Sequence, residues 1–191
     1  MGTRGKFGFF YKCKYYLCYN YWDSYPSYLG VHLLLEIIHA DLDEWIKLFK
    51  KMKQVSEKKK PTSADIKKLE KYTDLSGGGG THEWDNLLKL TQGSFHRVLQ
   101  SGYMENVHNV HQGEQYVYVL DLDNKVFRAQ GVRSGDTFDV TIKLETEELV
   151  RYVIEWSKGN PDEDYDPEKE LVILQERAKE NLARRREFER R

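Results

Sequence analysis

The chain has 191 residues, with 30 Lys plus Arg against 31 Asp plus Glu, so its formal net charge is −1. Hydrophobic residues make up 39% and aromatic residues 13%, which is enough for a sizeable core and argues against wholesale disorder. The balanced charge gives no general attraction to nucleic acid or to acidic membranes, so neither is expected as a partner. The two cysteines cannot form a disulfide scaffold, which predicts a reducing compartment.

No segment of the sequence predicts membrane association. The longest apolar stretch, residues 31–38, carries His32 and Glu36 and is too short to cross a bilayer. The first six residues contain no apolar signal core, and Lys6 stands where a myristoylation signal requires Ser or Thr. We therefore expect a soluble cytoplasmic protein.

The N-terminal region is unusually aromatic, because 11 of the 25 Phe, Tyr and Trp residues lie within the first 28 positions. Two aromatic runs, 6–11 and 15–22, flank a short polar segment at 12–14. Aromatic residues fit the half-buried surface of a sheet, so this pattern predicts a β-hairpin. Gly8 within the first run predicts a bulge or a close backbone approach.

The next part of the chain predicts helices. Residues 29–40 are apolar nearly all round, as in a buried helix, and an amphipathic helix is expected to begin near Asp41. A short helix is expected at 63–72. Apolar residues between 81 and 101 keep one helical face through Gly93, so one long helix is predicted there, despite a cost of about 1 kcal/mol for an interior glycine.

The C-terminal half predicts a second hairpin, a further strand and two helices. Residues 115–129 form the hairpin around an Asp-Asn turn, and 137–144 alternate as a strand. Thr146 is expected to cap a helix that ends at Lys158. Residues 161–191 are predicted to form an acidic linker and a charged C-terminal helix.

These elements predict an α+β fold with residues 1–160 as a single domain. The expected architecture is an antiparallel sheet built from two hairpins plus one strand, packed by several helices. The charged C-terminal helix is expected to project from this domain.

The polar residues at the open end of the first hairpin form the main candidate site. A hairpin of this length returns residues 20–23 toward residues 3–4. Seven residues are candidates for ligand binding: Thr3, Arg4, Asn20, Trp22, Asp23, Ser24 and Tyr25. One interpretation is a structural clasp with an Arg4–Asp23 salt bridge, and the other is a ligand pocket on a rigid scaffold.

The residues at this site resemble segments of a known group of proteins. The chain begins Met-Gly-Thr-Arg and continues with Asn-Tyr-Trp-Asp-Ser-Tyr-Pro at 20–26 and with Gly30. This resembles an uncharacterised family of bacteriophage, large DNA virus and fungal proteins with a His-Trp-Asp-x-Tyr-Pro-type segment, with Tyr21 in place of the histidine. The run at 116–123 also fits. The resemblance implies no established activity.

A second resemblance is to N-terminal-nucleophile hydrolases similar to choloylglycine hydrolase. Those enzymes begin Met-Cys-Thr, form a hairpin and return with an Asn-x-x-Asp segment, and Thr3 and residues 20–23 match that arrangement. The position of the nucleophile is occupied by Gly2, which has no side chain. The resemblance therefore implies a relative that binds without cleaving.

The pair Asp121 and Asp123 is similar to the first motif of haloacid-dehalogenase-type phosphatases. Asn124 and Lys125 follow the pair, where that motif requires a small residue and then Thr or Val. A hairpin turn explains the pair better than a magnesium-dependent phosphatase site.

Two further patterns favour ordinary structural explanations. His108 and His111 could bind a metal together with His96 or a cysteine, but they lack a third ligand at a fixed spacing, so no metal or cofactor is predicted. The lysine run between residues 50 and 60 lacks interleaved aromatic residues. It is interpreted as a solvated face rather than a nucleic-acid site.

Two functional hypotheses follow. The first is a non-enzymatic interaction module with a recognition site at the N-terminal strand and the 20–26 loop. The second is a small-molecule-binding or hydrolase-like domain that uses the same residues. A deep pocket walled by Trp22 and Tyr25 would favour the second, and a flat surface would favour the first.

The C-terminal helix is predicted to mediate weak self-association. Its acidic residues lie at its start, five of its last eight residues are arginines, and a thin apolar stripe runs between them. An antiparallel pair would place opposite charges side by side, each exposed pair adding only about 0.2–1 kcal/mol. Sedimentation of the full chain should show a concentration-dependent dimer that deletion of residues 167–191 abolishes. A full chain that stays monomeric at high concentration would contradict this.

Overall fold

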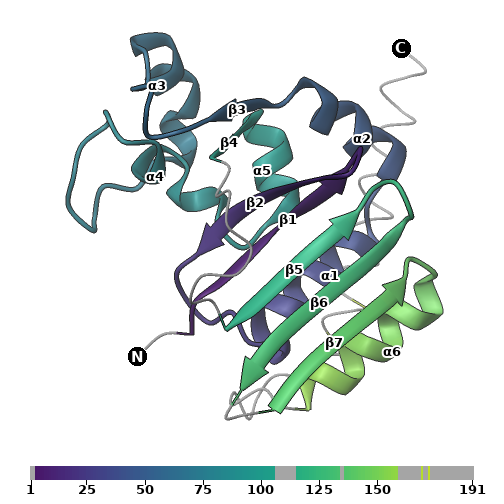
Figure 1. The fold of residues 1–191 in the computed structure, drawn as a ribbon. Coiled ribbons are helices and arrows are strands. Elements are labelled where there is room, and N and C mark those ends of the chain that lie inside the picture. The colour runs from purple at the N-terminus through teal and green to yellow at the C-terminus, as the bar shows by residue number, and fades with distance from the viewer. Residues whose placement is uncertain (1–2, 106–114, 134–135, 159–168, 170–171, 173–191) are drawn as a thin grey trace.

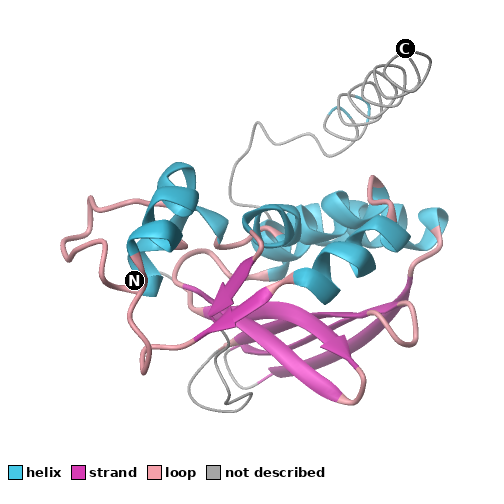
Figure 2. Cartoon of the chain, turned by 90° about the horizontal axis from the view of Figure 1, so that it is seen from above, coloured by secondary structure: helices cyan, strands magenta, loops and turns pink. Residues whose placement is uncertain are grey.

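The computed structural model describes residues 3–105, 115–133, 136–158, 169 and 172. A five-stranded sheet has the order β2-β1-β5-β6-β7, and helices cover one of its faces (Figures 1 and 2). Its strands are β1 (Gly5–Tyr11), β2 (Lys14–Asn20), β5 (Tyr116–Asp121), β6 (Val126–Arg133) and β7 (Asp136–Lys143). The predicted α+β class and both predicted hairpins are confirmed.

The β1–β2 hairpin closes through Lys12 and Cys13, whose φ angles are 49° and 59°. Such a two-residue turn with positive φ matches the twist of the flanking strands. Gly8 lies opposite Leu17 in a regular register. A Cβ atom on Gly8 would lie 1.9 Å from the carbonyl oxygen of Tyr16, so the predicted close backbone approach is what requires glycine here.

The β5–β6 hairpin is anchored by the buried carboxylate of Asp121. This carboxylate accepts hydrogen bonds from the backbone N–H groups of Asp123 (3.1 Å) and Asn124 (2.8 Å) and pairs with the Arg128 guanidinium. The side chain of Asp121 is fully buried. Its oxygens are thus engaged in holding the turn, in agreement with the turn interpretation of the Asp121 and Asp123 pair.

The sheet is mixed, whereas the sequence predicted an antiparallel one. β1 and β5 run parallel, with Gly5 opposite Tyr116. The backbone N–H of Gln115 donates to the carbonyl of Arg4 at 3.2 Å, so the chain re-enters the sheet at the end where β1 begins. The intervening helices carry the chain back to that end, which makes the pairing parallel.

The main core lies between the sheet and its helices. Phe9 packs against Phe49 and Phe95 at ring-centroid distances of 5.1 Å, and Tyr118 packs against Trp156 at 6.4 Å. The helices on this face are α1 (Val31–Ile38), preceded by the π-helical turn η1 (Pro26–Gly30), α2 (Leu42–Lys51), α5 (Phe95–Ser101) and α6 (Thr146–Ser157). Glu145 is the N-cap of α6, so the predicted capping by Thr146 is wrong.

The predicted long helix between 81 and 101 is also wrong. The chain forms α4 (Trp84–Leu87), a 3-10 turn η3 (Lys89–Thr91) and then α5. Gly93 adopts a φ of 74°, which ends the helical path. Ser94 then starts α5 by accepting a hydrogen bond from Arg97 N at 3.1 Å, and its hydroxyl donates to Glu36 on α1. Capping and this tertiary contact therefore override the apolar periodicity.

A second, smaller core lies beside β2 (Figure 1). Its elements are the parallel strands β3 (Lys53–Val55) and β4 (Tyr103–Glu105), with α3 (Ser63–Leu69), the 3-10 turn η2 (Glu70–Tyr72) and α4. Asp65 links them, because its carboxylate accepts hydrogen bonds from Lys53 (2.8 Å), Tyr103 (2.8 Å) and Thr62 N (3.0 Å).

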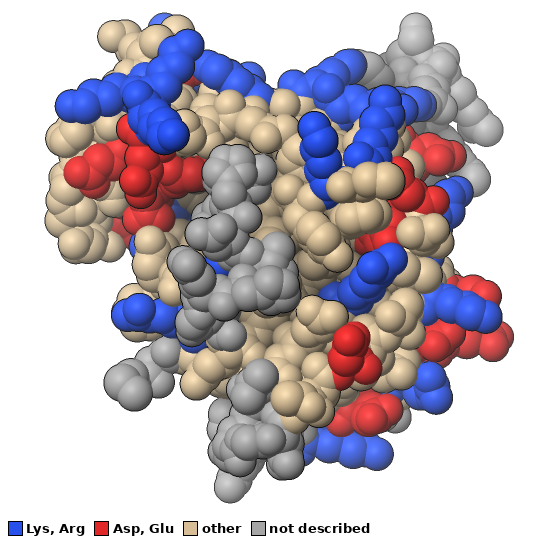
Figure 3. Space-filling model, in the orientation of Figure 1, with Lys and Arg blue, Asp and Glu red and all other residues tan. Residues whose placement is uncertain are grey.

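Lysine and arginine side chains gather over α2 and α3 (Figure 3). The lysines of the basic run between residues 50 and 60 are all exposed. Exposure is expected of a solvated face and of a nucleic-acid site alike, so the interpretation of the run as a solvated face stays a prediction.

Several predicted features lie outside the described residues. They include the acidic linker, the C-terminal helix apart from Lys169 and Val172, and the segment with His108 and His111. Within the described part of the chain, no helix has the length and apolarity needed to cross a bilayer.

Replacing Asp65 with Asn should destabilise the protein in a pH-dependent way. The hydrogen bonds from Lys53 and Thr62 hold the pKa of Asp65 well below its ordinary value. The stabilisation is therefore present above about pH 4 and is lost as the pH falls further. The free energy of unfolding in urea should drop by about 2 kcal/mol at pH 7 and by less at pH 3. Exposed Asp123→Asn is the control, and an equal loss at both pH values would contradict the assignment.

Candidate functional site

Polar groups at the open end of the β1–β2 hairpin form a clasp. Ser24 N donates to the carbonyl of Thr3 at 3.1 Å, and the Asn20 amide donates to Ser24 Oγ at 2.8 Å and to the carbonyl of Trp22. The hydroxyl of Tyr118 donates to the carbonyl of Ser24 at 2.8 Å. Asn20 and Ser24 are buried, so their polar groups hold the loop in place.

The predicted salt bridge between Arg4 and Asp23 is absent. Among the residues that the structure describes, no ion pair of 4.0 Å or less joins them. Arg4 is exposed, and Asp23 lies in a tight turn with a φ of 46°. The Ser24–Thr3 backbone hydrogen bond already closes the hairpin end, so the clasp does not depend on charge.

An open cleft of about 680 Å³ lies next to the clasp. We call it the aromatic cleft, because Trp22, Tyr25 and Tyr28 line one side, with Leu90 and Arg97 among the residues contributed by the segment from η3 to α5. Trp22, Tyr28 and Leu90 are 65%, 56% and 41% exposed. They are three of the six large hydrophobic side chains exposed in the described part of the chain. Such clustering of exposed apolar surface is common at interaction sites.

Charged side chains of both signs also line the aromatic cleft. Asp23 and Asp74 carry negative charge, and Lys89 and Arg97 carry positive charge. The Arg97 guanidinium donates to the carbonyl of Leu90 at 3.1 Å. Burial, and then the carboxylate of Asp23, raise the pKa of Tyr25, so its hydroxyl stays protonated at neutral pH. The lining is therefore rich in hydrogen-bond donors without an excess of charge.

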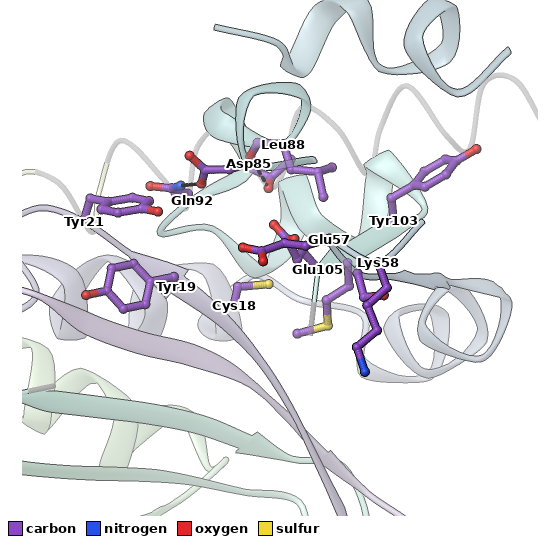
Figure 4. A pocket seen from close by; sticks show the side chains of 13 residues that line it. Cys18, Tyr19, Tyr21, Glu57, Lys58, Asp85, Leu88, Gln92, Tyr103 and Glu105 are labelled. Atoms are coloured by element: carbon purple, nitrogen blue, oxygen red, sulfur yellow. Dashed lines mark hydrogen bonds between the residues drawn. The ribbon is translucent and has the colours of Figure 1, made fainter. Parts of the chain in front are cut away.

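A second cleft of about 410 Å³ lies between β2, β4 and α4 (Figure 4). We call it the acidic cleft, because the carboxylates of Glu57, Asp85 and Glu105 point into it, whereas the ammonium of Lys58 points away. Burial raises the pKa of Glu105 to about 7, with further contributions from the charges of Asp85 and Glu57. Three like charges in one partly buried cleft disfavour full ionisation.

Two further side chains of the acidic cleft, Cys18 and Tyr21, stay protonated at neutral pH. Burial raises the pKa of the Cys18 thiol, which stays protonated. Burial and the nearby Asp85 carboxylate raise the pKa of Tyr21 to about 12. No group of three or more His, Cys, Asp or Glu side chains in the described ranges could hold a metal ion.

A polar wall separates the two clefts. Lys89 lies 3.9 Å from the centre of the Tyr21 ring and 3.7 Å from the Asp85 carboxylate. The Gln92 amide donates to Asp85 at 3.3 Å, and Gln92 lines both clefts. The clefts are therefore neighbours, linked by Gln92 and by the pairing of Lys89 in one with Asp85 in the other.

Four of the seven candidate residues line the aromatic cleft: Asn20, Trp22, Asp23 and Tyr25. The other three, Thr3, Arg4 and Ser24, are not among its lining residues. The sequence analysis did not single out Tyr28 or the opposite wall of the aromatic cleft. The signal available for Tyr28 was an aromatic residue two positions after Pro26. The acidic cleft was also missed, because Glu57, Asp85 and Glu105 are far apart in the sequence.

Comparison with known proteins gave no match to a family model, a curated protein or a solved structure. The resemblance of residues 20–26 to the viral and fungal proteins therefore stays a prediction.

Replacing Glu105 with Gln should stabilise the protein at high pH. The raised pKa means that the folded state keeps the proton where the unfolded chain has lost it, so stability falls as the pH rises through about 7. At pH 8.5 the free energy of unfolding in urea should be about 1–2 kcal/mol higher than in the wild type, because solvent contact reduces the full effect. Near pH 5 the two should differ little. Exposed Glu70→Gln is the control, and an equal gain at both pH values would refute the assignment.

Proposed function

We propose that this protein is a non-enzymatic binding module whose recognition site is the aromatic cleft. The observation that carries the proposal is the gathering of Trp22, Tyr28 and Leu90, all exposed, around one cleft. Exposed aromatic rings supply rigid contact area at low cost in side-chain entropy, which is why they dominate binding hot spots. The clasp holds the loop that carries Trp22. The composition, with two free cysteines, supports a cytoplasmic location.

The chemistry of the cleft supports binding rather than catalysis. Nucleophilic catalysis needs a hydroxyl or thiol hydrogen-bonded to a base. The described lining of the aromatic cleft has no such pair, and the Ser24 hydroxyl is buried beside Asn20.

A small-molecule-binding domain is the second candidate. The cleft volume of about 680 Å³ lies within the range of small-molecule sites, roughly 300–1,000 Å³. Trp22 and Tyr25 wall the cleft, as this hypothesis requires. However, such sites enclose most of their ligand, whereas Trp22 and Tyr28 are more than half exposed. The open form favours a segment of a larger partner.

A screen of small neutral molecules by ¹H–¹⁵N NMR tests the proposal. Hits should shift resonances of residues 20–32 and 89–97 together, because those segments form the two walls of the cleft. Trp22→Ala should weaken the hits about tenfold or more, as expected for a central aromatic anchor.

Tyr15→Ala is the matched control, because Tyr15 is an exposed tyrosine on β2 outside both clefts. It should leave the hits unchanged. Hits that scatter over the surface, or that survive Trp22→Ala, would overturn the assignment of the site.

A further inference from the structure

The aromatic cleft combines a protruding apolar side chain with a hollow beside it. Trp22 is the most exposed of the large hydrophobic side chains in the described part of the chain, at 65%. Tyr25, Tyr28 and Leu90 line the cleft that it borders. The cleft volume of about 680 Å³ lies within the roughly 300–1,000 Å³ of small-molecule sites, so it has room for an indole ring. A surface that carries both a projecting group and a hollow that fits it is self-complementary.

Opposite charges on the two walls add to this self-complementarity. Asp23 follows Trp22 directly in the chain, and Arg97 lies on the opposite wall. Among the described residues, neither Asp23 nor Arg97 has an ion-pair partner within 4.0 Å. The guanidinium donates to a backbone carbonyl rather than to a carboxylate. Each copy of the chain therefore presents one carboxylate and one guanidinium that a second copy could pair.

The other charges of the cleft are engaged within the subunit. Lys89 lies 3.7 Å from the Asp85 carboxylate. A backbone hydrogen bond of 2.8 Å, and then the charge of Lys89, lower the pKa of Asp74. Lys89 thus serves carboxylates on both of its sides. The charges left for an occupant are those of Asp23 and Arg97, which are equal and opposite.

We infer that the occupant of the aromatic cleft is a second copy of this chain, in a two-fold dimer that seats Trp22 of each copy in the cleft of the other. This inference rests on the proposed function of the cleft as a binding site. Because Asp23 is adjacent to Trp22, seating the indole against the opposite wall brings this carboxylate toward Arg97 of the partner subunit. Two-fold symmetry forms each contact twice. The interface involves few side chains, so the dimer is weak and depends on concentration.

The test is sedimentation equilibrium of the full chain over a wide range of concentrations, combined with NMR of the ¹⁵N-labelled chain on dilution. The chain should dimerise as its concentration rises, and dilution should shift the resonances of residues 20–32 and 89–97 together. Trp22→Ala should weaken dimerisation about tenfold or more, as expected for a central aromatic anchor. Tyr15→Ala, at an exposed ring outside both clefts, should change it less than about twofold.

A double-mutant cycle tests the charge pair. Asp23→Asn and Arg97→Gln should each weaken dimerisation about threefold to tenfold, because each dimer contains the pair twice. Asparagine tolerates the positive φ of 46° at position 23, so the turn is retained. The double variant should lose little more than either single variant, because both substitutions remove the same contact. Losses that simply add would show that the two side chains do not meet and would overturn the arrangement.

The outcomes separate this inference from the proposed function. If neutral small molecules bind the cleft but the full chain stays monomeric at every concentration, self-association is wrong and the binding site stands. If neither is observed, both are wrong. A dimer that persists in the Trp22→Ala variant and is lost on deletion of residues 167–191 would assign self-association to the C-terminal helix, which also overturns the inference. Unchanged circular dichroism of the variants would show that they are folded.

Discussion

The structure around the clefts depends on one buried polar contact, the hydrogen-bonded unit of Asn20 and Ser24. Ser24 is fully buried, and a Cβ atom on Gly5 would lie 2.6 Å from its Cβ, so glycine is needed at the start of β1. The Asn20 amide, the Thr3 carbonyl and the Tyr118 hydroxyl satisfy the polar groups of this loop. A buried polar cluster that is satisfied in this way rigidifies its surroundings. Trp22 consequently projects from a fixed turn.

The opposite wall of the aromatic cleft lies against Asn20 and is also held by a contact with Glu36. Gly93 has a φ of 74°, which favours glycine, and it lies close to Asn20, since a Cβ atom there would be 3.3 Å from Asn20 Oδ1. Glu36 on α1 accepts hydrogen bonds from the Ser94 hydroxyl and from His96 N, which sets the start of α5. Both walls therefore meet at Asn20. The cleft is a consequence of how β2, α1 and α5 are joined rather than of one mobile loop.

Local patterns in the sequence were sufficient for most of the elements but not for their long-range assembly. The aromatic alternation of β1 and β2 and the turn at Asp123-Asn124 identified both hairpins, because those signals are contained within a few residues. The break at Gly93 was missed, because it depends on a left-handed φ and on a contact between Ser94 and Glu36, which are 58 residues apart. The parallel pairing of β1 with β5 depends on where the chain returns after many helices.

The same distinction applies to the candidate site. Asn20 to Tyr25 could be singled out because polar and aromatic residues follow a predicted strand in a short segment. The Arg4–Asp23 salt bridge was a reasonable expectation from hairpin length, but a backbone hydrogen bond closes that end instead. The acidic cleft could not be predicted from the sequence, since its three carboxylates come from three separate segments.

The wall between the clefts makes their electrostatics interdependent. Lys89 partly neutralises Asp85, and the charge of Asp85 raises the pKa of Glu105 on the other side. A group in the aromatic cleft that drew Lys89 toward itself would leave Asp85 less compensated, and this would further disfavour ionised Glu105. Linkage requires the reverse as well, so the protonation of Glu105 would change the affinity of any ligand that engages Lys89. A neutral occupant would attract Lys89 only weakly, so it would leave the protonation of Glu105 nearly unchanged.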